Sequence, residues 1–271
     1  MSQISSFFRS PRGVAASAAK RTLLFPLTRQ VPPASLPEAP SPPRLSRRLR
    51  EETNRAHRLT ESTGFVRSLL KGSMDLASFR DMQAGLYLVY SRMETEIARN
   101  AWRPLVRMID FPELRRVDAL RRDLSILCGD HWEEQLALTP ARERYIERIR
   151  WVGAHDPDLL VAHSYTRYLG DLSGGRVVEG IARRALKIEG SAGLRFFHFP
   201  EIPNRKRFKE VYRQRLHEMP LPPHRADAFI AEANHVFALN RAVFEELEGS
   251  WLRALHRFVP RRLTDIRKHA K

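Results

Sequence analysis

The sequence predicts an all-α protein built around a single multi-helix domain. From Leu45 onward, apolar residues recur mostly at spacings of three and four, which is the helical period. Glycine is sparse, with 13 residues in 271, and the alternation of apolar and polar residues that marks strands is hard to find. At 42% hydrophobic residues the chain can bury a sizeable core.

Residues 1–44 differ in composition from the rest of the chain. They contain one acid, Glu38, against six basic residues, and serine and alanine are frequent early in the segment. This composition is typical of an organelle transit peptide, and the proline-rich stretch 32–43 predicts an extended linker. We expect import into an organelle, a mitochondrion ahead of a plastid. A disordered leader on a cytoplasmic protein is the alternative.

The domain begins with a helical pattern. Leu49, Ala56 and Leu59 continue it from Leu45, and apolar residues at 65, 66, 69 and 70 extend it. A second helix is predicted over residues 76–100. A third is predicted to start near Phe111 and to carry Leu114, Val117, Leu120, Leu124 and Leu127.

Two later helices have starts marked by proline. Thr139 is a good N-cap before Pro140, and Asp156-Pro157 repeats the pattern. The stripe after Asp156 continues past a glycine cluster to Leu186. Two further helices are predicted over 203–217 and 223–251. The domain is therefore expected to span 45–255, with a basic tail over 256–271.

The net charge of +16 favours an acidic partner or ligand. The charge is spread along the chain, so nucleic acid, a membrane surface, a carboxylate-bearing ligand and an acidic redox protein all fit. The single cysteine, Cys128, cannot form an internal disulfide. No run approaches the ~18–20 apolar residues of a membrane-spanning helix, so we expect no transmembrane anchor.

The most informative segment is 165–175, which reads YTRYLGDLSGG. Gly170, Gly174 and Gly175 lie inside a helical period, where each glycine costs about 1 kcal/mol relative to alanine. Glycine lets a backbone approach a flat partner and permits a kink. A phosphate-binding loop is excluded, because no strand precedes the segment and no Gly-Lys-Ser/Thr follows. Two explanations of the glycines remain: close packing against another helix, and a kinked helix that lies over a planar ligand.

A planar ligand also needs an opposite wall. His57 has Glu61 four residues later on the same helix face, and a metal-bound imidazole usually donates its other N–H to such a carboxylate. With ten histidines in the chain, spacing alone cannot select this one over a surface histidine. Lys209 and Arg213 form an i,i+4 cationic pair, and Arg50 lies two turns before His57. These cations suit either ligand carboxylates or a solvated basic face.

Residues 165–175, with Ala162-His163 before them, resemble the signature of biliverdin-producing heme oxygenases of the animal type. The likeness runs from about 49 to about 247 and includes the stretches 85–90, 208–213 and 237–240. It implies heme sandwiched between a proximal helix and a glycine-kinked distal helix. The implied reaction cleaves heme b at the α-meso carbon to biliverdin, carbon monoxide and ferrous iron, using O2 and external electrons.

The resemblance implies a role for each matching position. His57 matches the proximal iron ligand and Glu61 its partner. Gly170 and Gly174 match glycines that approach the heme face, and Asp171 matches the residue that orders distal water. The distal hydrogen-bond network is assigned to Tyr90, Arg167 and Asn240, and the heme contacts to Arg50, Tyr165, Lys209, Arg213 and Phe237.

The chain also departs from the animal pattern. Asn54 stands where some relatives have a lysine near the heme edge, the hydrophobic C-terminal anchor is missing, and Cys128 precedes Gly129 rather than proline. The endoplasmic reticulum surface, where animal relatives reside, is therefore only an alternative location.

The implied partner is an acidic electron donor, either a cytochrome P450 reductase-type flavoprotein or a ferredoxin, because the chain has no flavin or nicotinamide fingerprint. Biliverdin reductase is a further candidate partner, and no nucleic acid is expected. Two rival functions stay open: a catalytically inactive heme carrier or sensor, and a basic nucleic-acid-binding protein. The presence of both His57 and Asp171 favours the enzyme.

Overall fold

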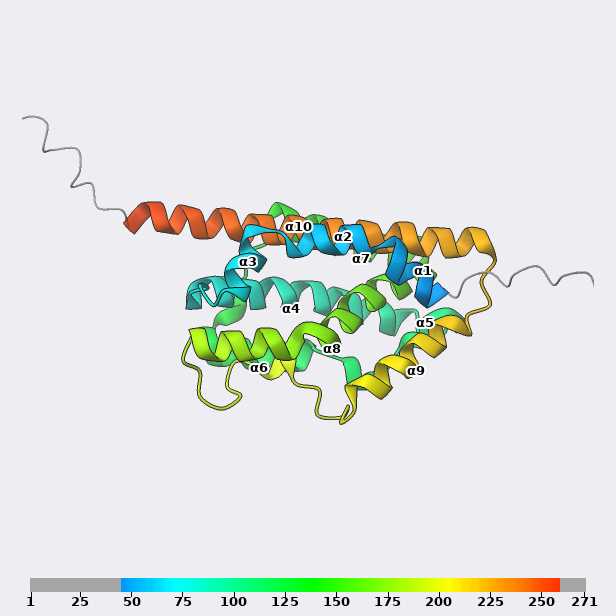
Figure 1. The fold of residues 1–271 in the computed structure, drawn as a ribbon, viewed down its shortest axis with the longest axis horizontal. Helices are drawn as coiled ribbons and strands as arrows, with labels where there is room; N and C mark the ends of the chain where they lie inside the picture. The colour runs from blue at the N-terminus through cyan, green and yellow to red at the C-terminus, as the bar shows by residue number, and fades with distance from the viewer. Residues whose placement is uncertain (1–44, 259–271) are drawn as a thin grey trace, which may run out of the picture. The chain divides into compact units, whose positions relative to one another are not determined.

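The computed structural model describes residues 45–258, with side chains through 248, and this part is helical without strands, as predicted (Figure 1). The predictions for 1–44 and 259–271 lie outside the described residues. The α-helices are α1 (Leu45–Glu52), α2 (Asn54–Glu61), α3 (Gly64–Leu70), α4 (Leu76–Arg99), α5 (Pro104–Ile109), α6 (Val117–Cys128), α7 (Pro140–His155), α8 (Leu160–Ala185), α9 (Arg205–His217) and α10 (Pro223–Phe258).

Threonines divide the first helical pattern into α1, α2 and α3. The Thr53 hydroxyl donates to the Leu49 carbonyl at 2.6 Å, and the Thr63 side chain accepts from the Val66 amide at the start of α3. Threonine side chains compete in this way for backbone groups, so helices often begin or end beside them. The result places His57 on a short helix of its own.

The predicted start of the third helix is wrong. Residues 112–114 form a separate 3-10 turn, and α6 begins only at Val117. Helix α5 was not predicted, because it is six residues long and too short to display a period. By contrast, α4 matches its prediction to within one residue and is capped by Asp75, which accepts from the Ser78 amide at 2.7 Å.

Helix α7 begins at Pro140 as predicted, but Thr139 does not cap it. Its hydroxyl instead donates to Glu246 on α10. Asp156 likewise caps nothing and pairs with Arg225 at 2.7 and 2.8 Å, and a 3-10 turn over Pro157–Leu159 leads into α8. Both predicted N-cap side chains therefore bind partners on α10 and do not cap their own helices.

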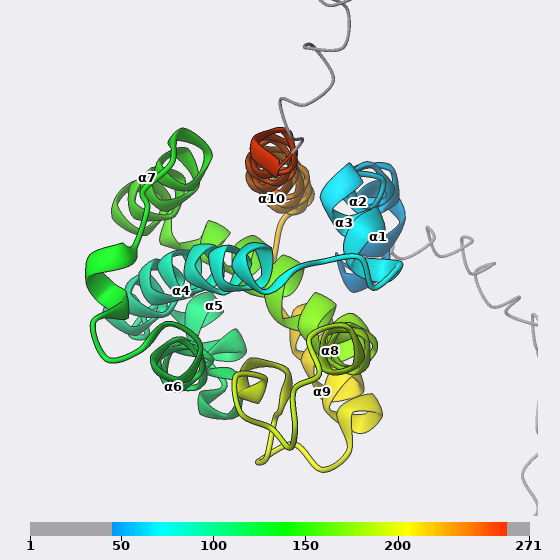
Figure 2. The same cartoon turned by 90° about the vertical axis from the view of Figure 1, so that its left-hand side faces the viewer.

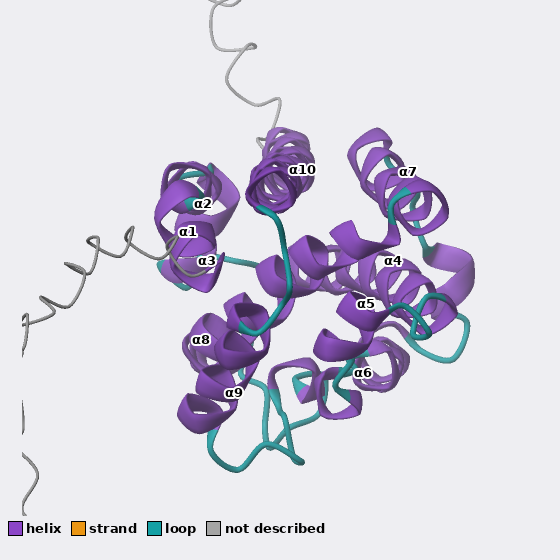
Figure 3. Cartoon of the chain, turned by 90° about the vertical axis from the view of Figure 1, so that its right-hand side faces the viewer, coloured by secondary structure: helices purple, strands orange, loops and turns teal. Residues whose placement is uncertain are grey.

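Helix α8 runs without interruption through the glycine cluster, and it changes direction along its length in Figure 1. Helix α10 extends to Phe258, beyond the predicted end at 251. Figures 2 and 3 show α1–α3 beside α10 and above α8, with α4 central and α6 and α7 on its other side.

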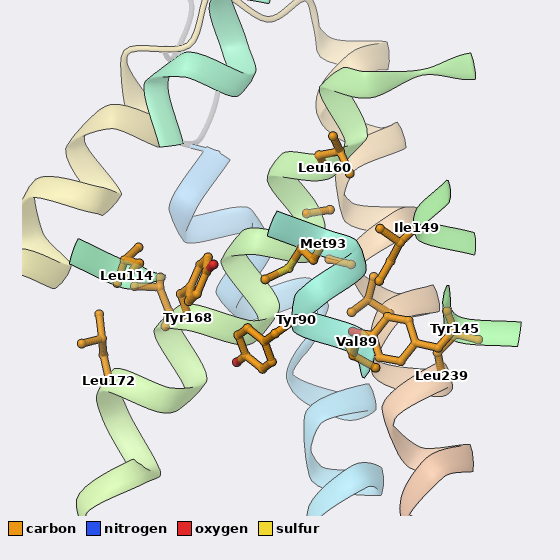
Figure 4. Close-up of a cluster of buried hydrophobic side chains, with 14 of the residues drawn as sticks. Val89, Tyr90, Met93, Leu114, Tyr145, Ile149, Leu160, Tyr168, Leu172 and Leu239 are labelled. Carbon is orange, nitrogen blue, oxygen red and sulfur yellow. The ribbon is translucent and has the colours of Figure 1, made fainter. Parts of the chain in front are cut away.

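The core lies between α4, α7, α8 and α10. Figure 4 shows buried side chains from these helices converging, with the Tyr90 and Tyr168 rings among aliphatic neighbours. Burying each large apolar side chain of this kind contributes roughly 1.5–3 kcal/mol to folding. No helix between residues 45 and 258 combines the length and apolarity needed to cross a membrane.

Candidate functional site

Four predicted residues from α4, α8 and α10 meet in one hydrogen-bond network. The buried Tyr90 hydroxyl donates to the Asp171 carboxylate. Arg167 Nε donates to the Tyr90 oxygen at 3.2 Å, and its Nη1 donates to Asn240 Oδ1 at 2.7 Å. Arg167 Nη2 lies 3.8 Å from Asp171 Oδ1. The structure thus assembles residues that lie up to 150 positions apart in the sequence.

Burial controls the electrostatics of this network. It raises the pKa of the Asp171 carboxyl, against the opposing charge of Arg167 and the hydrogen bond from Tyr90. It also raises the pKa of Tyr90 well above the usual tyrosine range. Tyr90 therefore remains a hydrogen-bond donor, and Arg167 balances the carboxylate. A buried carboxylate is costly without such partners.

The glycines of α8 separate into two kinds. A Cβ added at Gly170 or Gly174 would meet nothing within 4 Å, whereas at Gly175 it would lie 3.6 Å from Phe197 Cδ1. Close packing thus accounts for Gly175 only. Beside Gly170 and Gly174 there is open space, as required for a flat ligand to approach the backbone.

His57 lies on α2 with its side chain 47% exposed. Its Nδ1 is 3.4 Å from Glu61 Oε2, which is within reach but longer than an ordinary hydrogen bond. The ring meets Phe237 of α10 edge-on, with centroids 5.4 Å apart. Thr60 holds α2 against α10 by donating to the Phe237 carbonyl at 3.1 Å. The imidazole is therefore positioned by neighbours and accessible to a metal.

The predicted cations come from α1 and α9 and lie beside α8. Lys209 Nζ donates to Ser173 Oγ at 3.1 Å. Burial raises the pKa of Tyr165, and the charges of Arg213 and Arg50 oppose that rise, so both cations lie near its hydroxyl. Among the described side chains, no carboxylate lies within 4.0 Å of Arg50, Lys209 or Arg213. Such cations suit the carboxylates of a bound ligand.

A second buried network was missed by the sequence analysis. His163 is fully buried on α8, and its Nε2 lies 2.9 Å from Glu232 Oε1 on α10. Arg148 of α7 donates its Nε to the same oxygen at 3.0 Å. Burial alone would raise the pKa of Glu232, but the hydrogen bonds from His163 and Arg148 lower it to about 2. This network fastens three helices together, and no local signal could have revealed partners 69 and 84 residues apart.

Comparison with known proteins identifies the family. Residues 43–246 match the sequence model of the heme oxygenase family. Heme oxygenase 1 of a Nostoc species is 43% identical over 211 residues, covering 78% of this chain and 89% of that protein. Human heme oxygenase 1 is also 43% identical, covering 76% of this chain and 73% of the human protein.

A solved structure agrees with these relatives. The crystal structure of heme oxygenase-1 from a Synechocystis cyanobacterium in complex with heme superposes with a TM-score of 0.76 at 41% identity. The match covers 80% of this chain and 97% of that one. On sequence and structure together, the chain belongs to the heme oxygenase family.

Proposed function

We propose that the chain binds heme b and cleaves it oxidatively at the α-meso carbon to give biliverdin, carbon monoxide and ferrous iron. The observation that carries this proposal is the hydrogen-bonded Asp171 on the same helix as two glycines that face open space. The accessible His57 with Glu61 nearby adds an iron ligand. Family membership supports the same reaction.

The described residues fit both the iron and the propionate groups of heme. A half-exposed imidazole can bind iron, and its neighbouring carboxylate can fix the ring orientation. Arg50, Lys209 and Arg213 can hold two propionates, because none of them is neutralised by a contacting carboxylate. Gly170 and Gly174 leave room for a flat ring.

When bound, heme supplies both the iron that activates O2 and the ring that is oxidised. The protein's own task is orientation and proton control. Asp171 Oδ2 accepts from Tyr90, which leaves Oδ1, facing Arg167 at 3.8 Å, to hold a water molecule on the distal side. That water can relay a proton without the carboxylate leaving its partners. His57 and Glu61 fix the opposite side, and the propionate cations set the in-plane rotation.

The test combines spectroscopy and turnover. Hemin added to the full chain should give a Soret band, and ascorbate or a ferredoxin–reductase system should then replace it with the spectrum of biliverdin. A stable Soret band without bilin would instead identify a heme carrier or sensor. Salt-dependent retention on DNA without any Soret band would favour a nucleic-acid-binding protein.

The electrons are proposed to come from an acidic donor, a ferredoxin or a cytochrome P450 reductase-type flavoprotein. The net charge of +16 supports this choice, because opposite charges accelerate encounter between redox proteins. Raising the salt concentration should therefore slow turnover supported by such a donor, while turnover with ascorbate should change little.

Reversing the charge at Lys209 and Arg213 should weaken heme binding and mix the bilin isomers. The double variant Lys209→Glu, Arg213→Glu repels the propionates and frees the in-plane rotation of the ring. Hemin titration and chromatography of the products measure both effects. The control variant Lys206→Glu, Arg207→Glu makes the same charge change at exposed positions of the same helix. Pure α isomer at parental yield from the first variant would remove these cations from the site.

Residues 1–44 are proposed to direct the chain into an organelle, a mitochondrion ahead of a plastid. A fusion of this segment to a fluorescent protein should accumulate in the organelle and be shortened there. The control replaces Arg9, Arg12, Lys20 and Arg21 with glutamate, since import depends on the basic face of such leaders. Cytosolic fluorescence from the unmodified fusion would contradict the proposal, and labelling of the endoplasmic reticulum would support the alternative.

A further inference from the structure

Three positions of α8 define one stripe of the helix. Arg167, Asp171 and Gly175 are spaced four residues apart, so they lie one above another on the same face. Gly175 has no side chain to cover this stripe, and Arg205 of α9 reaches it beside Phe197. Arg205 Nη1 lies 4.0 Å from where a Cβ of Gly175 would be. Asp171 therefore has a guanidinium one helical turn away in each direction.

The Arg205 guanidinium is held in place but incompletely paired. Its Nη2 donates to the Phe197 carbonyl at 2.7 Å, and its Cζ lies 5.1 Å from the centre of the Phe199 ring. Its Nη1 is buried, with no hydrogen-bond partner in the described part of the chain. Buried donors of this kind are normally satisfied by ordered water.

A second cation shares the Phe199 ring. Arg116 Cζ lies 3.9 Å from its centre, and the hydrogen bonds of the Arg116 side chain all go to backbone carbonyls. Neither guanidinium has a described carboxylate within 4.0 Å, although the Arg116 backbone N–H donates to Glu94 Oε1 at 2.6 Å. The charge of each guanidinium nevertheless acts on Asp171. Burial, and then the charge of Arg176, lowers the pKa of Arg205. Both desolvation and the neighbouring positive charge therefore disfavour a charged guanidinium at this position.

We propose that Arg205 is a positioning residue of the distal site: it occupies the space left by Gly175 and holds the Asp171 carboxylate, through water, from the side opposite to Arg167. A role of Arg205 in catalysis rests on the proposed function. The effect of Arg205 on the Asp171 carboxylate does not depend on that function. Arg205 would keep the carboxylate ionised and its water ordered when protons are delivered.

The charged and titratable groups that interact electrostatically with Asp171 come from α4, α7, α8 and α9 and from the residue before α6. They are Tyr90 of α4, Arg116 before α6, Tyr145 of α7, Arg167 of α8 and Arg205 of α9. The competing view is that Arg205 only fastens the 195–197 turn through the Phe197 carbonyl. A glutamine can still donate to that carbonyl but carries no charge, so Arg205→Gln separates the two views.

The experiment is a 13C NMR titration of aspartate carboxyl groups in the full chain without hemin, with the Asp171 signal assigned by its loss in Asp171→Asn. We expect Arg205→Gln to move the half-titration point of Asp171 upward by about one pH unit, as for loss of a nearby cation in a partly solvated site. Arg205→Lys should stay near the parent. Lys206→Gln, an exposed neighbour with the same charge change, should not move it.

An Asp171 titration in Arg205→Gln that matches the parent would overturn the proposal. So would equal shifts in Arg205→Gln and Lys206→Gln, because these would reflect net charge alone. If Arg205→Gln does not fold, Arg205→Met is titrated in its place, because it also removes the charge and keeps an unbranched side chain. An Asp171 half-titration point in Arg205→Met that matches the parent would overturn the proposal. All of these results are independent of whether the parent forms bilin with hemin, which tests the proposed function separately.

Discussion

Bilin formation should fall by about 10²-fold or more when His57 is replaced by alanine, because the proposed iron ligand is removed. The fold should survive, since the imidazole is half exposed and alanine is the residue best suited to a helix. Added imidazole should restore part of the normal Soret band and part of the turnover by taking the vacant position. Absorption spectroscopy and the bilin yield measure both effects, and thermal melting verifies folding.

The matched control for this variant is His131→Ala. The His131 side chain is 83% exposed and lies beside Glu134. It is therefore also a histidine next to a glutamate, but it does not belong to the candidate site. Parental spectra and yields are expected from the control. The same parental result from His57→Ala would exclude His57 as the ligand.

Ring opening should collapse in Asp171→Ala by about 10²-fold or more, the size of a proton-transfer contribution. Heme affinity should remain close to that of the parent, because His57 and the propionate cations are unchanged. Hydrogen peroxide should then support peroxidase-like oxidation in place of bilin formation. The Tyr90 hydroxyl and Arg167 lose a buried partner, so a stability loss of about 1–3 kcal/mol should accompany the change.

Asp171→Asn is the companion variant. Its amide can still accept from Tyr90 and hold water, so turnover should be reduced less than in Asp171→Ala. Biliverdin production by the alanine variant at the parental rate would refute the distal-water role. Complete loss of heme binding would assign Asp171 a structural role.

The sequence predicted the long helices well because their period is set by local amphipathic pattern. Helix α4 is an example, where the pattern and the Asp75 cap agree. The sequence-based predictions were wrong where tertiary contacts determine the hydrogen-bond partner of a side chain. Thr139 and Asp156 have the right residue types for caps, but Glu246 and Arg225 lie close enough in space to bind them instead.

The same distinction applies to the candidate site. The resemblance located Tyr90, Arg167, Asp171 and Asn240, and the structure brings them into contact. It could not locate Arg205, whose place against Gly175 depends on the path of the chain between α8 and α9. No periodicity or motif encodes such a path.

The two sides of the site share a single turn of α10. Phe237 touches the His57 imidazole, and Asn240, three residues later, binds Arg167 of the network around Asp171. Three residues advance a helix by about 4.5 Å, a spacing fixed by backbone geometry. Mutations that slide or tilt this turn would therefore disturb His57, the proposed iron ligand, and the hydrogen-bond network of Asp171 together. If His57 and Asp171 have the proposed roles, substitutions in this turn that change heme affinity would also change the outcome of the reaction.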